Sequence, residues 1–466
     1  MTLRPAYSES FRCIGSSCED TCCQGWSVPI DEATHQRYHD LPASPLRTLI
    51  VDNLVRIELA PCGATPYGTN PAAPKPAAFA KIKMDGANRC PLLSEDRLCR
   101  IQQTYGEPLL SHSCATYPRI VSTVEGVEER ALTLSCPEAA RLVLLTPALL
   151  LTDAQPRRYA AGSPPPAGGP AILSWFHPIR AAAIALVRNR AYPLWQRLFL
   201  LGIFCRRIDS INGAEPKAQD ELPLALHVFL REFDSTVAAG SLRTPMEALP
   251  VDRPAQLDAV LRLAGMLLHR SNVRPRFVEC INAFTAGIGN GPGGTLESLT
   301  AHYAVAHDRW FEPFFARHPH ILENYLINTI FRCQFPFGRE CLNGDATPSL
   351  SREFAQLTAQ FALIKGLLIG VAGFHREAFS ADHLVHTVQA ASKHFEHHPE
   401  FLTMAHALLV ESRLDGARGT AILLRNSDPV APRPDAEPLR IVELPGRRGA
   451  APWQQAGMAE MSAGAD

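Results

Sequence analysis

The sequence lacks an excess of charge of either sign. Its 466 residues include 45 Lys and Arg against 46 Asp and Glu, which gives a formal net charge of −1. Proteins that bind nucleic acid through its phosphates need a surplus of basic residues. We therefore expect no nucleic-acid partner.

Long apolar runs and a secretory signal are missing as well. The longest apolar stretches, residues 142–151 and 361–374, fall short of the roughly 20 residues that cross a bilayer as a helix. Residues 1–11 lack the basic start and apolar run of a signal peptide. We expect a cytoplasmic protein without a membrane span.

Two common cysteine spacings are absent. No C-x2-C pair occurs, although zinc sites usually contain one because a tight turn then presents two sulfurs to one ion. The C-x3-C-x2-C spacing of radical S-adenosylmethionine enzymes is incomplete, because Cys18 and Cys22 fit its first half but the next thiol, Cys23, is adjacent. Spacing alone thus favours neither a zinc knuckle nor radical chemistry.

A nucleotide-binding turn is not evident either. The usual site for a cofactor that contains a nucleoside is a strand followed by a glycine-rich turn and a helix. The glycine-rich segment 287–294 contains a proline and follows the helical stretch 276–286, so it is typical of a loop between helices. Such a cofactor, if one binds, needs another architecture, such as the interface between two domains.

Cysteine is the residue that stands out among those present. Nine of the 13 cysteines fall within the first 136 residues. In a reducing cytosol, such a segment binds metal or performs redox chemistry more often than it forms disulfides. Eight of the nine form two groups in sequence: Cys13, Cys18, Cys22 and Cys23, and then Cys90, Cys99, Cys114 and Cys136. We interpret Cys62, Cys205, Cys280 and Cys333 as non-ligands, the first because it lies in a Pro-rich loop and the others because they lie on helical faces.

The composition divides the chain into parts. We expect a small irregular Cys-rich metal domain over residues 1–140 with a Pro-rich loop at 61–78, a linker at 155–170, an all-helical domain over 171–425 and a largely disordered tail at 426–466. The predicted fold class is therefore mostly α. Apolar residues at helical spacing predict helices over 175–190, 194–205, 222–238, 254–270, 296–317, 320–333, 351–373, 382–396 and 399–413.

Three blocks of the sequence resemble a known family. They are residues 11–31 (FRCIGSSCEDTCCQGWSVPID), 90–119 (CPLLSEDRLCRIQQTYGEPLLSHSCATYPR) and 323–338 (ENYLINTIFRCQFPFG). Together they are similar to the flagellin lysine N-methylase family, over about residues 7–415. The two cysteine blocks also resemble a broader group of proteins with eight shared cysteines that chelate zinc or iron.

The resemblance implies a cytoplasmic enzyme that transfers methyl groups from S-adenosylmethionine to lysines of flagellin and carries an iron–sulfur cluster of the 4Fe-4S type. The ligands would come from Cys13, Cys18, Cys22, Cys23, Cys90, Cys99, Cys114 and Cys136. We favour Cys22, Cys90, Cys99 and Cys114 because they sit in the densest matched blocks.

The proposed chemistry suggests further candidates. Lysine attacks a methyl sulfonium as the neutral amine, so the site must desolvate the amine or accept its proton. Tyr117 and Tyr325 lie in matched blocks and are weak catalytic candidates, although each is also typical of a core tyrosine. Arg119 is a weak candidate for binding the cofactor carboxylate, or else forms a structural salt bridge. Trp26 and Tyr38 are expected to pack over the first cysteine group.

Other interpretations remain open. The chain could be a non-enzymatic metal-cluster module that senses redox state or chelates metal and acts through a protein partner, or a structural zinc protein. Methyl transfer could be polar or radical. His394 and His398 could share a metal ion, but a solvated helix end before Pro399 explains HFEHH more simply.

Overall fold

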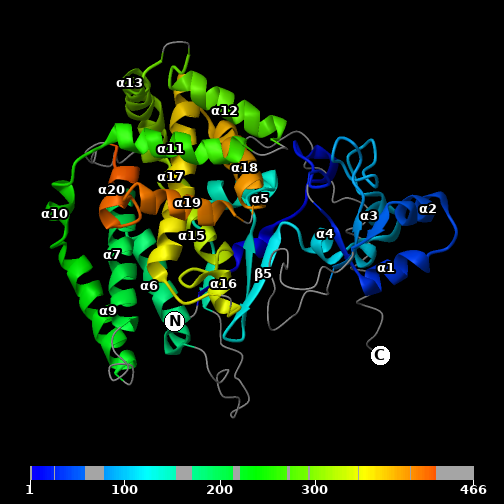
Figure 1. Cartoon of the computed structure of the whole chain (residues 1–466), viewed down its shortest axis with the longest axis horizontal. Helices are drawn as coiled ribbons and strands as arrows, with labels where there is room; N and C mark the ends of the chain where they lie inside the picture. Colours follow the sequence, from blue (N-terminus) through cyan, green and yellow to red (C-terminus); the bar gives the residue numbers. More distant parts are fainter. Residues whose placement is uncertain are drawn as a thin grey trace.

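The computed structural model describes most of the chain (Figure 1). The described residues are 3–25, 27–57, 78–153, 170–213, 221–269, 273–291, 294–344, 346–398 and 400–426. The predicted Pro-rich loop, linker and tail, as well as Trp26 and Cys62, therefore lie wholly or almost wholly outside the described residues. Helices predominate, which confirms the mostly α fold class.

A small unit with its own core lies at one end of the molecule (Figure 1). Its antiparallel sheet has the order β2 (Pro29–Asp31), β4 (Ala78–Ile82) and β3 (Leu54–Arg56). Four helices accompany it: α1 (Glu32–His39), α2 (Pro45–Asp52), α3 (Arg100–Tyr105) and α4 (His112–Thr116). The Asp31 side chain caps α1 by accepting a hydrogen bond from the Thr34 amide at 2.8 Å, so the strand passes directly into the helix. The core of this unit runs from Val28 to Leu110.

A β-hairpin connects the small unit to the helical body. Strands β5 (Arg119–Val124) and β6 (Val127–Leu132) pair through a two-residue turn, in which Glu125 and Gly126 both have positive φ. Helix α5 (Pro137–Leu145) follows, and β7 (Leu151–Asp153) pairs with β1 (Leu3–Pro5). The hairpin and α5 share one hydrophobic cluster with the helices beyond residue 170.

The helical body surrounds one long buried helix, α17 (Leu350–His375). The other helices of this body are α6 (Phe176–Arg188), α7 (Leu194–Asn212), α9 (Leu222–Ala239), α10 (Arg243–Glu247), α11 (Arg253–Leu268), α12 (Pro275–Gly287), α13 (Leu296–Ala306), α14 (Glu312–Arg317), α15 (His320–Arg332), α16 (Gly338–Leu342), α18 (Ala381–Phe395), α19 (Phe401–Glu411) and α20 (Ala417–Leu424). A π-helical turn, His307–Phe311, joins α13 to α14. Glycines allow α17 to approach α12 closely, because a Cβ added at Gly287 would lie 1.8 Å from the Gly370 carbonyl oxygen.

The predicted helical windows agree with the helices of the structure, including the loop after α12. Several features were not predicted: the short strands and the helices α1–α4 of the N-terminal part, the short helices α10, α16 and α20, and the π-helical turn that interrupts the expected helix over 296–317. The expected helix over 351–373 is also longer at both ends, which makes it the central helix of the body.

Two helical stretches, Ala171–Arg188 and Leu350–Ala378, are long and apolar enough to cross a membrane by length and composition. The second is 94% buried inside the protein and the first 50%. Such burial is typical of core helices, since helix–helix packing already removes their apolar surface from water.

Candidate functional site

The cysteines of the small unit are brought together by backbone pairing. The Cys90 amide donates to the Cys23 carbonyl at 2.8 Å, next to a β-bridge between Gln24 and Arg89. A second bridge joins Leu93 to Cys99 and so folds Cys99 back beside Cys90. The first cysteine block is thereby joined to the second across about 67 residues of sequence.

Four thiols, those of Cys22, Cys90, Cys99 and Cys114, each interact electrostatically with the other three. Burial and, to a smaller extent, the neighbouring sulfurs of Cys99, Cys22 and Cys90 raise the pKa of Cys114 to about 12. Cys90 is affected by Cys99 and Cys22 in the same way, and Cys99 by Cys22. These interactions place the four thiols in one neighbourhood, which Cys23 shares, and the choice of Cys22, Cys90, Cys99 and Cys114 as ligands stays a prediction.

The remaining thiols lie around this group. Cys23 interacts with Cys99 and Cys114, whereas the pKa of Cys136 is raised first by burial and then by Cys18 and Cys13. Cys136 therefore neighbours the first cysteine block rather than the second, because it caps α5 after the hairpin has reversed the chain. Cys22 lies between the two neighbourhoods, since it also acts on Cys13 and Cys18.

Cys22 is the thiol most readily deprotonated in this group. The pKa of Cys22 is lowered to about 7. The hydrogen bond from Cys23 is the largest cause, and the Lys393 ammonium adds to it, whereas burial acts in the opposite direction. Among the described residues, no three or more His, Cys, Asp or Glu side chains are arranged as a ready metal site. The donor set of four mutually interacting thiols nevertheless suits a soft metal centre by its chemistry.

Helix α18 holds the first cysteine block against the helical body. The Lys393 ammonium donates to the Asp20 carboxylate at 2.6 Å and to the Thr21 carbonyl at 2.8 Å. Gln389 also donates to Asp20, at 2.8 Å, and Arg274 donates to the Gln24 carbonyl at 2.7 Å. Residues 20–24 are therefore fixed by side chains from far along the chain.

Replacing Lys393 by Met should loosen this block. Asp20 would keep its charge in a site where its side chain is 14% exposed, so we expect a loss of about 2–3 kcal/mol, somewhat below the cost of breaking a fully buried pair. Amide hydrogen exchange should rise across residues 18–24, and the urea midpoint should fall. Lys81→Met, at an exposed lysine of β4, is the control and should change neither. Unchanged exchange in the Lys393 variant would contradict the assignment.

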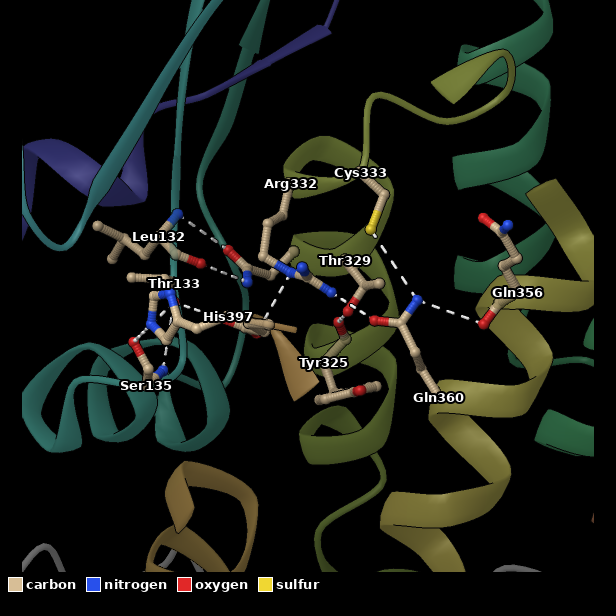
Figure 2. A network of polar contacts seen from close by, with 12 residues as sticks. Leu132, Thr133, Ser135, Tyr325, Thr329, Arg332, Cys333, Gln356, Gln360 and His397 are labelled. Atoms are coloured by element: carbon tan, nitrogen blue, oxygen red, sulfur yellow. Dashed lines mark hydrogen bonds and ion pairs between the residues drawn. The ribbon is translucent and has the colours of Figure 1, made fainter. Parts of the chain in front are cut away.

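A buried polar network extends from the cysteine neighbourhood into the helical body (Figure 2). The Thr133 hydroxyl donates to the Glu396 carboxylate, which is paired with Arg332 at 3.3 Å. Arg332 donates in turn to the Gln360 side-chain oxygen at 2.6 Å. On the other side, the Thr133 and Ser135 hydroxyls are 2.9 Å apart. The network thus joins the exit of the hairpin to α15, α17 and the end of α18.

The two tyrosine candidates differ in their positions. Tyr117 is half-buried and its hydroxyl lies 3.1 Å from the Ser135 hydroxyl, at the cysteine end of the network. Tyr325 lies within α15 and is 1% exposed. Burial raises the pKa of both phenols, most strongly for Tyr117, where Cys136 adds to the effect. Both therefore remain protonated at neutral pH, which favours hydrogen-bond donation over proton acceptance.

The other sequence candidates are placed as follows. Arg119 donates to the Phe11 carbonyl at 3.2 Å and lies over the Phe11 ring, so it is engaged in local structure beside Cys13. Tyr38 is buried, donates to the Leu109 carbonyl at 2.8 Å and interacts with Cys114 and Cys99. It packs near the second cysteine block.

The interpretation of HFEHH as a solvated helix end is wrong. His394 is 2% exposed and accepts a hydrogen bond from the Arg274 amide at 3.1 Å, whereas Glu396 is 9% exposed and belongs to the network. Sequence reasoning missed Lys393, Glu396 and Arg332 because charged side chains near a helix end are usually solvated. Lys393 and Glu396 stand three residues apart, so the sequence alone presents them as an ordinary exposed pair and gives no signal of their burial.

Comparisons with known proteins identify the family to which the helical body is similar. The C-terminal domain of the FliB lysine N-methylase matches residues 180–423, just over half of the chain. The flagellar biosynthetic protein FliU of Salmonella muenchen is 33% identical over 144 residues, which are 31% of this chain and 76% of that protein. Lysine-N-methylases of Salmonella typhimurium and Salmonella choleraesuis are also 33% identical over 144 residues, but the match spans 32% of their length. No solved structure matches.

The family model includes α15, α17 and α18, and therefore Arg332, Gln360, Lys393 and Glu396. It begins inside α6 and leaves out the cysteine blocks. The predicted family resemblance is confirmed: the chain belongs to the FliB lysine N-methylase family.

Proposed function

We propose that this chain is an S-adenosylmethionine-dependent protein-lysine N-methyltransferase that acts on flagellin and carries an iron–sulfur cluster. The observation that supports it most directly is the docking of the four-thiol group, through Asp20 and Lys393, onto the helical domain that defines the family. The names of the relatives, lysine-N-methylase and flagellar biosynthetic protein, support the acceptor and the substrate class.

The cluster ligands we propose are Cys22, Cys90, Cys99 and Cys114. Their sulfurs would have to converge when the cluster binds, because they do not yet form a ready metal site. Bound there, an iron–sulfur cluster supplies electron transfer or a Lewis-acidic iron. The chain's own residues hold a positive charge, that of Lys393, beside Cys22.

Methyl transfer requires that the acceptor lysine be present as a neutral amine. A free lysine is neutral in only about one part in a thousand near pH 7.4, so the site must remove the ammonium proton or disfavour the charged form by desolvation. The phenols of Tyr117 and Tyr325 are poor acceptors because burial raises their pKa values. A carboxylate with an elevated pKa is better suited to this role.

The test uses the full chain, purified without oxygen and assayed for iron and sulfide. Incubation with S-adenosylmethionine and flagellin of the same organism should raise the flagellin mass in methyl increments. Cys99→Ser should lose iron and activity together, whereas Cys62→Ser should keep both. Iron-loaded protein that adds no methyl group would overturn the transferase assignment, and colourless protein containing zinc would overturn the cluster.

Two further outcomes distinguish the remaining interpretations. Release of 5′-deoxyadenosine on reduction would show a radical route, and its absence during turnover would show polar transfer. The docking of the cysteine block on α18 also suits a redox-sensing module, since a change at the thiols would reach Lys393 directly. Binding of a protein partner in one cluster redox state, without methyl transfer, would favour that function.

A further inference from the structure

A small recess opens beside the matched block of residues 323–338. It lies at the end of the polar network that is farther from the two cysteine blocks. It is lined by Cys333, Phe335, Glu353, Gln356, Leu357 and Gln360, from the end of α15 and the first half of α17. Figure 2 shows Gln360 between Arg332 and Cys333, with Gln356 one helical turn away on α17. The recess has a volume of about 10 Å³, which admits one group of the size of a water molecule.

The floor and the mouth of the recess differ in chemistry. Phe335, Leu357 and Gln360 are 1–3% exposed and form the floor, whereas Cys333, Glu353 and Gln356 are partly exposed. Gln360 is fixed from both ends, because its oxygen accepts from Arg332 and its nitrogen donates to the Gln356 carbonyl at 3.3 Å. The recess therefore combines an apolar wall with a carboxylate and amide groups.

The backbone makes room for the Glu353 carboxylate. Gly338 has a φ of +74°, and a Cβ added there would lie 2.4 Å from one carboxylate oxygen and 2.6 Å from the other. Gln334 also has a positive φ, of 56°, so the segment after α15 curls around the recess. A side chain at position 338 would displace Glu353, and glycine is the residue that permits this conformation at low cost.

Glu353 has little positive charge to balance it. Among the described residues, the Arg352 guanidinium is the cationic group within 4.0 Å, and its nearest nitrogen lies 3.5 Å away. Arg352 also lies 4.0 Å from the exposed carboxylate of Glu340, so it is shared. Direct charge-assisted bonds are about 2.7–2.9 Å long. Burial raises the pKa of Glu353 to about 7, and Arg352 offsets only part of this rise.

We propose that this recess binds the ε-ammonium group of an acceptor lysine, with Glu353 as its counter-ion. A primary ammonium has the size of the water-sized space, whereas the planar guanidinium of arginine is too large for it. Phe335 and Leu357 form the floor behind the ammonium, and the aliphatic stem extends outward past Cys333 and Gln356 at the mouth. The inference rests on the proposed function for the source of the lysine, but the recess can be tested without methyl transfer.

The test measures protection of the Cys333 thiol. Alkylation by iodoacetamide is followed at Cys333 by peptide mapping, with acetylated and amidated Gly-Lys-Gly, Gly-norleucine-Gly or Gly-Arg-Gly present. At about four times its dissociation constant, the lysine peptide should slow alkylation about fivefold. The norleucine and arginine peptides should leave the rate near that of the free protein.

Two variants isolate the carboxylate. Glu353→Gln keeps the shape and removes the charge, so it should lose the protection by the lysine peptide. Glu340→Gln removes the other carboxylate near Arg352. The Glu340 side chain is 71% exposed, and this variant should retain the protection by the lysine peptide. Circular dichroism and thermal melts confirm that both variants fold. Equal protection by norleucine, or full protection in Glu353→Gln, would overturn the proposal.

The methylation assay separates this inference from the proposed function. Glu353→Gln should raise the KM for flagellin more than it lowers kcat. If wild-type protein methylates flagellin and the variant has an unchanged KM, the recess is not the lysine site and the function stands. If wild-type protein adds no methyl group but the lysine peptide still protects Cys333, the recess binds amines and the function falls.

Discussion

Replacing Arg180 by Met is expected to lower the free energy of unfolding by about 3–5 kcal/mol, because it leaves a buried carboxylate without its partner. Arg180 on α6 and Glu129 on β6 are each 1% exposed. Their side chains pair through two hydrogen bonds, one of them 2.8 Å long. The guanidinium also lies between the rings of Phe176 and Phe331, 4.5 and 4.6 Å from their centroids.

The matched experiment is a double-mutant cycle followed by urea unfolding. Glu129→Leu alone should be as damaging as Arg180→Met, since it leaves the guanidinium unpaired. The double variant should recover much of the loss, because removing both charges also removes their desolvation cost. Additive losses in the double variant would show that the two residues act independently, contrary to the structure.

Replacing Asn328 by Leu is expected to cost on the order of 3 kcal/mol, because three buried polar groups lose their partner. Asn328 is 0% exposed. Its amide oxygen accepts from the Tyr7 hydroxyl at 2.7 Å and from the Leu132 amide at 3.3 Å, and its nitrogen donates to the Leu132 carbonyl at 2.8 Å. The side chain thus ties α15 to the hairpin and to the N-terminal segment.

Thr329→Val is the control for Asn328→Leu, at the adjacent position of α15. The Thr329 hydroxyl donates to the Tyr325 carbonyl within the same helix, at 2.8 Å, so its loss should cost less than about 1 kcal/mol. Chemical unfolding of both variants measures the difference. Similar losses in the two variants would mean that Asn328 contributes only as a packed side chain.

The same helix shows how the sequence and the structure divide the information. In α15, Asn324, Asn328 and Arg332 follow one another at intervals of four and so share a face. Asn324 donates to the Val143 and Thr146 carbonyls, at 2.9 and 2.7 Å, and Arg332 reaches Glu396. This periodicity is readable in the sequence, but the partners are not, because they lie between 28 and 321 residues away. These contacts give part of the matched block of residues 323–338 a structural role.

The sequence by itself determined the helical class and the positions of most helices, because these follow from periodicity and composition, and its three matched blocks carried the resemblance to the family. The tertiary structure decided which thiols become neighbours, since backbone pairing of Cys23 with Cys90 and the hairpin before Cys136 regroup them. It also decided that Lys393 and Glu396 are buried and that Glu353 is largely enclosed. Burial of a charge depends on contacts between distant segments, and a one-dimensional pattern does not contain those contacts.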